Sequence, residues 1–440
     1  MRSIIYNDAL EYLYRSYAKG IRVGLDGVKN VLANMGNPQA KLSVIHVAGT
    51  NGKGSICAFL QHILVEAGYK VGTFTSPHLH RYNERITIDG HPISDRDFAK
   101  FLTTVDNAAV MSGFDTKSSA TQRLSFFEIL TCMAYGYFAE KNVDIAIIET
   151  GIGGRLDSTN VIDHPLLSVI TAPGYDHQEL LGDTLSQIAF EDAGIIKRDC
   201  PVAIYPTPVL SVFTKLAKEK HSPIYYIGEN VEITELTHNL EGTKFSVTTA
   251  YFSYQSLNIR LLGEHQVQNA IHALLCVEAL RDGKCAIAIS TDAVRQGLAK
   301  CQWPGRFELI SKPPKGPYIV LDGAHNEDGA RIFKEALELY FPDRYIVLVV
   351  GISHHKDYKN ILRHMLPPAN LVICTCSNFK AMPADELATC VKEQTDIPIW
   401  TEPNLNAALT KAVEAAGSEG VVAVAGSLYL IGDVKGVYPS

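Results

Sequence analysis

The strongest constraint in the sequence is an apolar segment that runs directly into a glycine-rich loop and then into a helical pattern. The segment from Leu42 to Ala48 reads LSVIHVA, the loop GTNGKGS follows, and SICAFLQHILVEAG continues from the loop's serine, with Gly68 as the expected end of the helix. This order predicts a strand, a loop and a helix, the opening of a βαβ unit. The chain is therefore expected to be an α/β protein with a mostly parallel sheet.

The same alternation continues through the N-terminal part of the chain. YKVGTFTSP closes the βαβ unit, and the helix FFEILTCMAYGYFAE and the strands DIAIIET and LLSVITA follow. From Asn230 to Leu262, short alternating segments such as TKFSVTTAYFSY predict an antiparallel hairpin or a small edge sheet. A helix that starts near His265 is expected to return to the first domain.

A second alternating series follows the candidate linker AKCQWPGR. It contains YIVLDGAH, a helix after Asn326, and then YIVLVVG, LVICTC, IPIW and VVAVAG. Because 440 residues exceed what one hydrophobic core usually fills, we expect two domains. The prediction is a P-loop mononucleotide-binding α/β domain over residues 1–299 and a smaller, Rossmann-like α/β domain over residues 300–440.

Composition and charge argue against several classes of protein. The formal net charge of −7 does not suit a nucleic-acid binder, which needs a basic surface to replace phosphate counterions. Asp8 and Glu11 interrupt what would be the apolar part of a secretory signal, and no apolar run approaches the ~20 residues of a membrane span. Nine cysteines without regular spacing suit reduced thiols, and Cys374 and Cys376 fit a core segment better than a metal site. We expect a cytoplasmic protein that binds neither membrane nor nucleic acid.

The glycine-rich loop carries the strongest functional signal. Its glycines let backbone N–H groups turn toward a phosphate, the following helix N-terminus favours negative charge, and Lys53 can reach the terminal phosphates. Two residues rather than four separate its first two glycines, so the spacing departs from the usual P-loop. We predict a mononucleotide clamp in which Ser55 faces the metal ion on the nucleotide. The clamp consists of Gly49, Thr50, Asn51, Gly52, Lys53, Gly54 and Ser55.

Three further polar clusters follow predicted strands, where α/β folds place ligands: TSPHLHRYNER, ETGIGGRLDSTN and GYDHQELLG. We expect them to converge on one cleft. Glu149 ends an apolar strand and is expected to bind Mg²⁺ or a cation, the alternative being a helix cap or a solvated side chain. His177 is either a structural hydrogen-bonding residue or, with Asp176 and Glu149, a metal ligand. Arg155 and Asp157 form either a surface ion pair or a site for an anionic substrate.

Together these motifs resemble those of the folylpolyglutamate synthases and dihydrofolate synthases of the Mur ligase superfamily. The resemblance spans nearly the whole chain. It rests on the ordered segments GNPQAKLSVIHVAGTNGKGS, TSPHLHRYNERI, FFEILTCMAYGYF, ETGIGGRLDSTNVI, DHQELLGDTLSQIAFEDAGIIK, LLGEHQVQNAIHAL, WPGRFE, LDGAHN and GSLYLIGDV.

The resemblance implies an ATP site at the interface of the two domains. The GTNGKGS loop would bind the phosphates, and the remaining ATP-binding residues would be Asn269, Arg306, Asp322, His325 and Asn326. Two Mg²⁺ ions are implied as cofactors, with Ser55, Ser76 and Glu149 as ligands and His177 serving the second ion. The candidate substrate-binding residues are His78, Arg81, Arg155 and Asp157.

The family's chemistry is ATP-dependent amide ligation. A substrate carboxylate attacks the γ-phosphoryl group, whose charge Mg²⁺ and Lys53 spread, and an amine then displaces phosphate from the acyl phosphate. The expected catalytic residues are Lys53, Glu149, His177 and Asp192. The resemblance implies a folate or dihydropteroate as the acid and L-glutamate as the amino acid, both small molecules, and we expect the chain to act as a monomer.

The sequence departs from the family pattern at several positions. The family's lysine in Glu-Lys-Ala-Gly, typically carbamylated to support the second Mg²⁺, is Asp192 here, which either keeps an electrostatic role or is a solvated helix residue. Ala172–Tyr175 differs before Asp-His, Glu327 replaces a proline, and His354-His355-Lys356-Asp357 stands where Asp-Lys-Asp is common. Because these changes cluster near the second metal and the acceptor substrates, two alternatives stay open: a paralogue that joins a different acid and amine, and a non-catalytic ATP-binding homologue.

Overall fold

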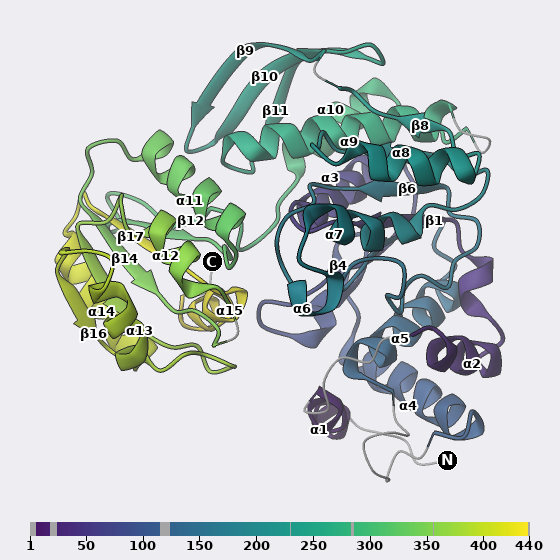
Figure 1. Cartoon of the computed structure of the whole chain (residues 1–440), viewed down its shortest axis with the longest axis horizontal. Helices are drawn as coiled ribbons and strands as arrows, with labels where there is room; N and C mark the ends of the chain where they lie inside the picture. The colour runs from purple at the N-terminus through teal and green to yellow at the C-terminus, as the bar shows by residue number, and fades with distance from the viewer. Residues whose placement is uncertain are drawn as a thin grey trace.

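The computed structural model describes residues 6–17, 24–114, 124–228, 230–282, 286–354 and 356–438, so His355 lies outside the described residues. Figure 1 shows two α/β units side by side, the first in purple to teal and the second in green to yellow. The chain passes from the first to the second through residues 301–307, between α10 (Thr291–Lys300) and β12 (Glu308–Ser311).

The first unit is built on a mostly parallel sheet. Its strand order is β4-β3-β2-β5-β1-β6-β7-β8, in which only β3 and β4, at one edge, run antiparallel to their neighbours. The inner strands are buried on both faces, which accounts for their continuous apolar sequences. The strands are β1 (Val44–Ala48), β2 (Val71–Phe74), β3 (Ile86–Ile88), β4 (His91–Pro92), β5 (Ile145–Glu149), β6 (Leu167–Ile170), β7 (Val202–Ile204) and β8 (Ile224–Tyr225).

Helices cover both faces of this sheet because successive strand residues point to opposite sides. Ile45 and Val47 of β1 pack in a cluster with α3, α9 and α10, whereas Val44 packs in the cluster formed by α1, α2, α4 and α5. The helices are α1 (Tyr6–Tyr17), α2 (Asp26–Asn34), α3 (Lys53–Glu66), α4 (Asp95–Met111), α5 (Phe126–Glu140), α6 (Gln178–Leu181), α7 (Leu185–Asp192), α8 (Leu210–Glu219) and α9 (Glu264–Asp282), with short 3₁₀ turns η1 (Pro38–Lys41), η2 (Tyr82–Arg85) and η4 (Ala193–Ile195).

Between β8 and α9 the chain forms a separate antiparallel sheet, as the alternating segments of the sequence predict. It consists of β9 (Glu232–Asn239), β10 (Gly242–Thr248) and β11 (Ser253–Ile259), and it lies across the top of the molecule in Figure 1. Its inward side chains Phe245, Val247 and Leu257 join the core that α9 and α10 cover, so this sheet is packed onto the first unit.

The second unit repeats the α/β design around its own core. Its strand order is β12-β13-β17-β14-β15-β16, parallel except for β12 at the edge. The other strands are β13 (Tyr318–Leu321), β14 (Ile346–Val350), β15 (Leu371–Cys374), β16 (Ile399–Thr401) and β17 (Val421–Ala425). One face carries α11 (Glu327–Tyr340), α12 (Tyr358–Met365) and α13 (Ala384–Lys392), and the other carries α14 (Leu405–Ala416) and α15 (Leu428–Val437). The predicted fold class is confirmed.

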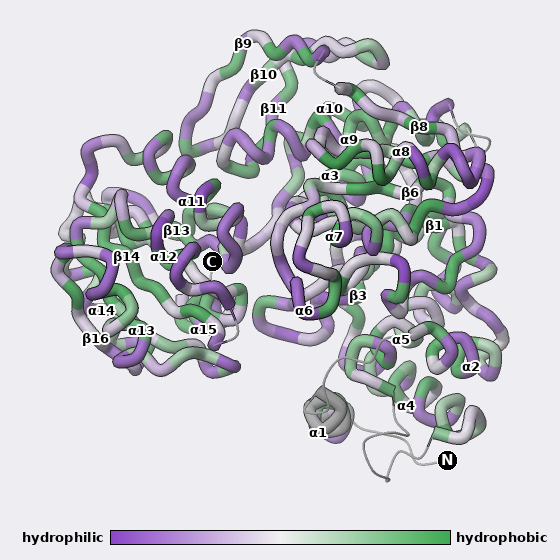
Figure 2. Tube along the Cα trace, in the orientation of Figure 1, coloured by the Kyte–Doolittle hydropathy of each residue, from purple (hydrophilic) through white to green (hydrophobic). Residues whose placement is uncertain are grey.

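Hydropathy follows this layering, with apolar residues along the central strands and polar residues on the outer helices (Figure 2). Cys374 is buried in the core of the second unit, and every cysteine within the described ranges is a free thiol. Among the helices of the described part of the chain, none is long and apolar enough to cross a membrane.

Candidate active site

The carboxyl ends of the parallel strands in the two units face a common cavity. β1 lies between β5 and β6, so the loop after β1 is flanked by Glu149 at the end of β5 and by the segment that follows β6. The second unit contributes the loop after β13, the start of α11 and Leu428 at the start of α15. Ligands of open α/β sheets bind at such strand ends.

Most of the predicted site residues line this cavity. They come from both units: Gly49, Thr50, Asn51, Gly52, Lys53, Gly54, Ser55, Ser76, Glu149, His177, Asp192, Asn269, Arg306, Asp322, His325 and Asn326. The predicted convergence of the polar clusters is therefore confirmed for Ser76, Glu149 and His177, which follow three different strands.

Two glycines in the loop after β1 are required by backbone conformation and by close packing. Gly49 has φ 134° and Gly52 has φ 86°, both in the region that favours glycine. A Cβ on Gly49 would lie 2.2 Å from Oγ1 of Thr171, and one on Gly52 would lie 2.7 Å from Oδ1 of Asn269. The loop is therefore closely packed on these sides, and the N-terminus of α3, which follows the loop, lies at the cavity.

Hydrogen bonds hold the loop to the segment after β6. The backbone N–H groups of Thr50 and Asn51 donate to the carbonyl of Ala172 at 3.1 and 3.0 Å. The Thr50 hydroxyl donates to the Gly174 carbonyl at 3.0 Å and accepts from the Gly174 N–H at 2.9 Å. The Ala172–Tyr175 segment, which departs from the family sequence, therefore directly supports the loop Gly49–Ser55, the predicted phosphate loop.

Lys53 folds back over its own loop. Its Nζ donates to the carbonyl oxygens of Gly49 at 2.7 Å and Thr50 at 3.2 Å. The ammonium group is thereby held beside the positive end of α3, where a phosphate would bind.

Two buried carboxyl groups of the first unit face the cavity. Glu149 accepts a hydrogen bond from the Ser76 N–H at 2.9 Å, and its burial raises its pKa although the charge of Lys53 opposes this. Asp192 is only 1% exposed, its Oδ2 has no hydrogen-bond partner among the described residues, and burial raises its pKa to about 7. The expectation that Asp192 is a solvated helix residue is therefore wrong.

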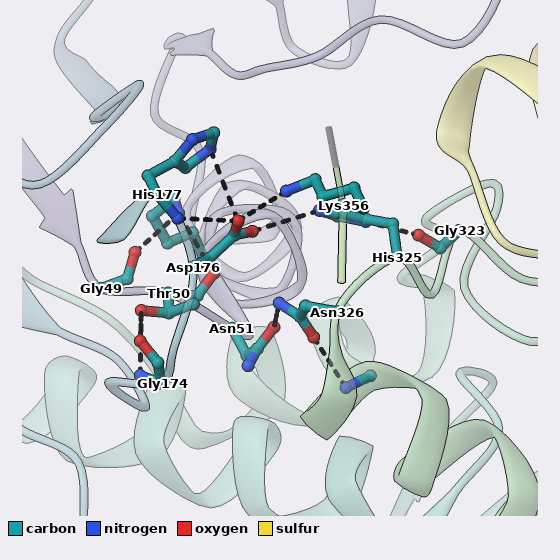
Figure 3. Close-up of polar contacts among 12 residues, drawn as sticks. Gly49, Thr50, Asn51, Gly174, Asp176, His177, Gly323, His325, Asn326 and Lys356 are labelled. Atoms are coloured by element: carbon teal, nitrogen blue, oxygen red, sulfur yellow. Dashed lines mark hydrogen bonds and ion pairs between the residues drawn. The ribbon is translucent and has the colours of Figure 1, made fainter. Parts of the chain in front are cut away.

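Asp176 is the centre of a polar cluster that joins the two units (Figure 3). Its carboxylate lies 2.6 Å from Nζ of Lys356, 3.7 Å from Nε2 of His325 and 3.9 Å from Nε2 of His177. It also accepts the backbone N–H of His177 at 2.9 Å. Burial alone would raise the pKa of Asp176, but its cationic neighbours, Lys356 first, lower it to about 2.

Both histidines of this cluster have a lowered pKa. Burial lowers the pKa of His177, and it lowers the pKa of His325 to about 4. The His325 Nδ1–H donates to the carbonyl of Gly323 at 2.7 Å, which leaves Nε2 as an acceptor. His177 sits at φ 52° just before α6, so its backbone adopts a left-handed conformation at the cavity wall.

Asp322 and Asn326 shape the second unit's side of the cavity. The Asp322 carboxylate accepts the N–H groups of Phe307 at 2.8 Å and Ala324 at 2.7 Å. Burial raises its pKa, and the charge of Arg306 opposes this. Asn326 caps α11 and donates from Nδ2 to Oδ1 of Asn51 at 3.1 Å, a direct contact with the phosphate loop.

The four predicted substrate-binding residues do not line the cavity, and each of them has polar partners of its own. His78 accepts a hydrogen bond from Nε of Arg85 at 2.8 Å. Arg81 forms an exposed ion pair with Asp95 at 2.7 Å. Arg155 pairs with Glu191 at 2.9 Å rather than with Asp157.

Asp157 is buried and holds the loop after β5. Its Oδ2 accepts the N–H groups of Gly151 at 2.9 Å and Ile152 at 3.1 Å, and its Oδ1 accepts from the Thr159 hydroxyl at 2.6 Å. A surface ion pair between Arg155 and Asp157 is therefore wrong, while a role of this loop in substrate binding stays a prediction.

The sequence analysis did not predict that Lys356 and two apolar side chains, Ile332 and Leu428, lie at the site. Lys356 reaches the site only because β14 ends beside the first unit, and Ile332 and Leu428 line the cavity from two helices of the second unit. The only signal for Lys356 in the sequence is its place in the segment His354–Asp357, where Asp-Lys-Asp is common in the family.

A larger cavity of about 350 Å³ lies at the opposite edge of the first sheet, where β6 and β7 begin. Its lining is mostly apolar and includes Leu166, Pro201, Leu280 and Ile287. Its lining has neither the glycine loop nor buried carboxylates, so the cavity between the units, with a volume of about 210 Å³, is the candidate active site.

Comparison with known proteins gives consistent matches. Residues 93–277 match the family described as the Mur ligase middle domain, and residues 305–428 match the Mur ligase, glutamate ligase domain. A dihydrofolate synthase/folylpolyglutamate synthase of Bacillus subtilis (strain 168) is 36% identical over 436 residues, which is 98% of each chain.

Solved structures match over the whole chain as well. The folylpolyglutamate synthase of Thermotoga maritima is 33% identical with a TM-score of 0.82, covering 99% of this chain and 97% of that chain. The folylpolyglutamate synthase of Mycobacterium tuberculosis, complexed with ADP and AMPPCP, is 29% identical with a TM-score of 0.89, covering 99% of both chains. FolC of E. coli in complex with DHPP and ADP is 28% identical with a TM-score of 0.86, covering 98% of this chain and 97% of that chain.

Proposed function

The chain belongs to the folylpolyglutamate synthase and dihydrofolate synthase family of Mur ligases, and from this we propose that its interdomain cavity joins a pterin-containing acid to L-glutamate at the expense of ATP. The protein is an ATP-dependent ligase that acts on small molecules. The observation that carries the proposal is the meeting of a phosphate-binding loop from one unit with Arg306, Asp322, His325 and Asn326 from the other in one cavity.

ATP would bind with its phosphates on the loop Gly49–Ser55. The N-terminus of α3 and the ammonium of Lys53, which already bonds two loop carbonyls, favour negative charge there. Arg306 would approach the phosphates from the second unit. A kinase or simple ATPase would not require a second α/β unit at the same nucleotide.

The reaction proceeds by two displacements. A carboxylate oxygen of the acid attacks the γ-phosphorus, the bond to the bridging oxygen breaks, and ADP leaves. The amine then attacks the carbonyl carbon of the acyl phosphate, inorganic phosphate leaves and the amine loses a proton. Lys53 offsets charge on the transferring group, and the docked second unit excludes water that would hydrolyse the acyl phosphate.

The cavity's donor set suits Mg²⁺. Among the described residues, no three His, Cys, Asp or Glu side chains are grouped to hold a metal by themselves, whereas Mg²⁺ takes many of its ligands from phosphate and water. Ser55, Ser76 and Glu149 would hold one ion and His177 a second, with the unpartnered Oδ2 of Asp192 available beside them. When bound, the ions would neutralise phosphate charge.

The proposal extends to the acid and to the organisation of the protein. Candidate acids are dihydropteroate and reduced folates. Two loops next to the cavity would bind the acid, and they carry His78, Arg81, Arg155 and Asp157. We further propose domains at residues 1–299 and 300–440, a monomeric state and action in the cytoplasm.

The test is incubation of purified protein with Mg-ATP and candidate acids, with and without L-glutamate, while ADP, phosphate and product mass are followed. Lys53→Met serves as the inactive control, since it removes the loop's charge. Turnover with dihydropteroate or a reduced folate is expected. Turnover with other acids alone would instead favour a paralogue, and ATP binding without ADP formation from any acid would favour a non-catalytic homologue.

A further inference from the structure

One ion pair joins the two units beside the cavity. Nζ of Lys356, which follows β14, lies 2.6 Å from Oδ1 of Asp176, which follows β6, although 180 positions separate them in the sequence. The side chains are only 20% and 14% exposed. Figure 3 shows Lys356 and His325 reaching toward Asp176 from one side and His177 from the other.

Lys356 makes the shortest contact with the carboxylate of Asp176. Its Nζ lies 2.6 Å from Oδ1, whereas Nε2 of His325 and Nε2 of His177 lie 3.7 and 3.9 Å from the carboxylate. A carboxylate as enclosed as Asp176 is costly without a cationic partner. The ion pair therefore exists only while the second unit is docked, and separation leaves both charges without their partner.

The same interface contains the contact between Asn326 and the phosphate loop. Asn326 donates to Asn51 at 3.1 Å, and a Cβ on Gly174 would lie 2.8 Å from Oδ2 of Asp328 at the start of α11. Docking thus brings the start of α11 against the loop and against the segment that supports it. The two halves of the proposed ATP site come together only in this arrangement.

We propose that Lys356 is a positioning residue that acts through Asp176 to hold the second unit docked over the phosphate loop. This rests on the proposed function only in that the cavity is taken as the ATP site. When the binding-competent state is a fraction f of the protein, the apparent dissociation constant rises by 1/f. Loss of the ion pair therefore lowers ATP affinity without removing any group that touches the reacting atoms.

The first test is the kinetics of Lys356→Met. We expect the KM for ATP to rise about tenfold, with kcat at saturating ATP within about twofold of wild type, since bound ATP contacts both units and restores docking. Lys356→Arg retains the charge and should restore most of the affinity. In an Asp176→Asn background, the further effect of Lys356→Met on ATP affinity should be small.

A matched control is available within the second unit. Lys435 pairs with Glu308 at 2.5 Å, with side chains 17% and 22% exposed, so Lys435→Met removes a similarly enclosed ion pair that does not cross between units. Its KM for ATP should stay at the wild-type value. A direct measurement places fluorophores at Met111 on α4 and Leu339 on α11, which are 71% and 38% exposed, and follows the energy transfer between them.

Without nucleotide, Lys356→Met should show a wider distribution of distances than wild type, and a non-hydrolysable ATP analogue should narrow it. An unchanged distribution would overturn the proposal. It would also be overturned by a fall in kcat at saturating ATP with an unchanged KM, or by a raised KM for the amine alone, which would make Lys356 a substrate contact. Analogue affinity and energy transfer need no turnover, so wild-type protein that fails to bind the analogue would refute the proposed function instead.

Discussion

Gly432 on α15 of the second unit lies directly against the loop after β2 of the first unit. A Cβ at this position would lie 1.8 Å from the carbonyl oxygen of Leu79 and 2.7 Å from its carbonyl carbon. Carbon and oxygen normally approach to about 3.3 Å, so the Gly432→Ala substitution forces the two backbones apart by more than about 1 Å. Overpacking of this kind typically costs ~1–3 kcal/mol.

This cost should fall on docking, because Leu79 belongs to the first unit and Gly432 to the second. Each unit can keep its own fold while the interface opens. A cost of ~1–3 kcal/mol on the docked state weakens ATP binding by up to about 5- to 150-fold. Titration calorimetry with a non-hydrolysable ATP analogue measures this change, and thermal unfolding reports whether either unit has lost stability.

Gly436 provides the control one turn later on the same helix. A Cβ there would meet only the His80 ring, with Cε1 at 3.6 Å and Nδ1 at 3.8 Å, both ordinary contacts. Gly436→Ala should bind the analogue as wild type does and gain up to ~1 kcal/mol from higher helix propensity. Wild-type affinity in Gly432→Ala, or an equal loss in Gly436→Ala, would refute the reasoning.

Three further outcomes are expected. Burial, and then the charge of Lys197, lowers the pKa of His46 to about 3, so His46 stays neutral in the folded state but takes up a proton in the unfolded state below pH ~6.5. The free energy of unfolding, measured in urea, should therefore fall by about 1.4 kcal/mol between pH 7.5 and 5.5, and His46→Gln should lack this part of the decrease. Asp192→Asn should raise the Mg²⁺ concentration for half-maximal rate about 10- to 100-fold, and an unchanged Mg²⁺ dependence would remove Asp192 from metal support. Gly54→Ala places a Cβ 2.8 Å from the Trp303 ring and should cost ~1–3 kcal/mol in thermal unfolding unless Trp303→Leu accompanies it.

The fold was predictable because its signals are local. Strand and helix periods and the glycine after α3 each depend on residues within a few positions. Ser125 and Glu128 form a capping box that starts α5, and Gly68 at φ 90° follows the end of α3. Strand ends then bring Ser76 and Glu149 to one edge of the sheet without further information.

Side-chain partners were not predictable in the same way. Arg155 and Asp157 are two positions apart, but their directions depend on how the loop between Gly151 and Thr159 closes. Asp157 turns inward because the N–H groups of Gly151 and Ile152 require acceptors, and Arg155 turns outward to Glu191 on α7. Each partner is set by tertiary packing that no sequence period encodes.

The departures from the family sequence are scattered along the chain, yet those in the described residues gather where the two units meet. Pro173 and Tyr175 flank Gly174, which bonds the loop Gly49–Ser55 and backs onto Asp328 beside Glu327. Lys356, inside the other differing segment, pairs with Asp176, the residue that follows Tyr175. A change on one side of such an interface alters what the other side must supply, so these segments act as one surface. The phosphate loop itself is unaltered. Differences in substrate from other members of the family should therefore arise at this interface, while ATP binding is retained.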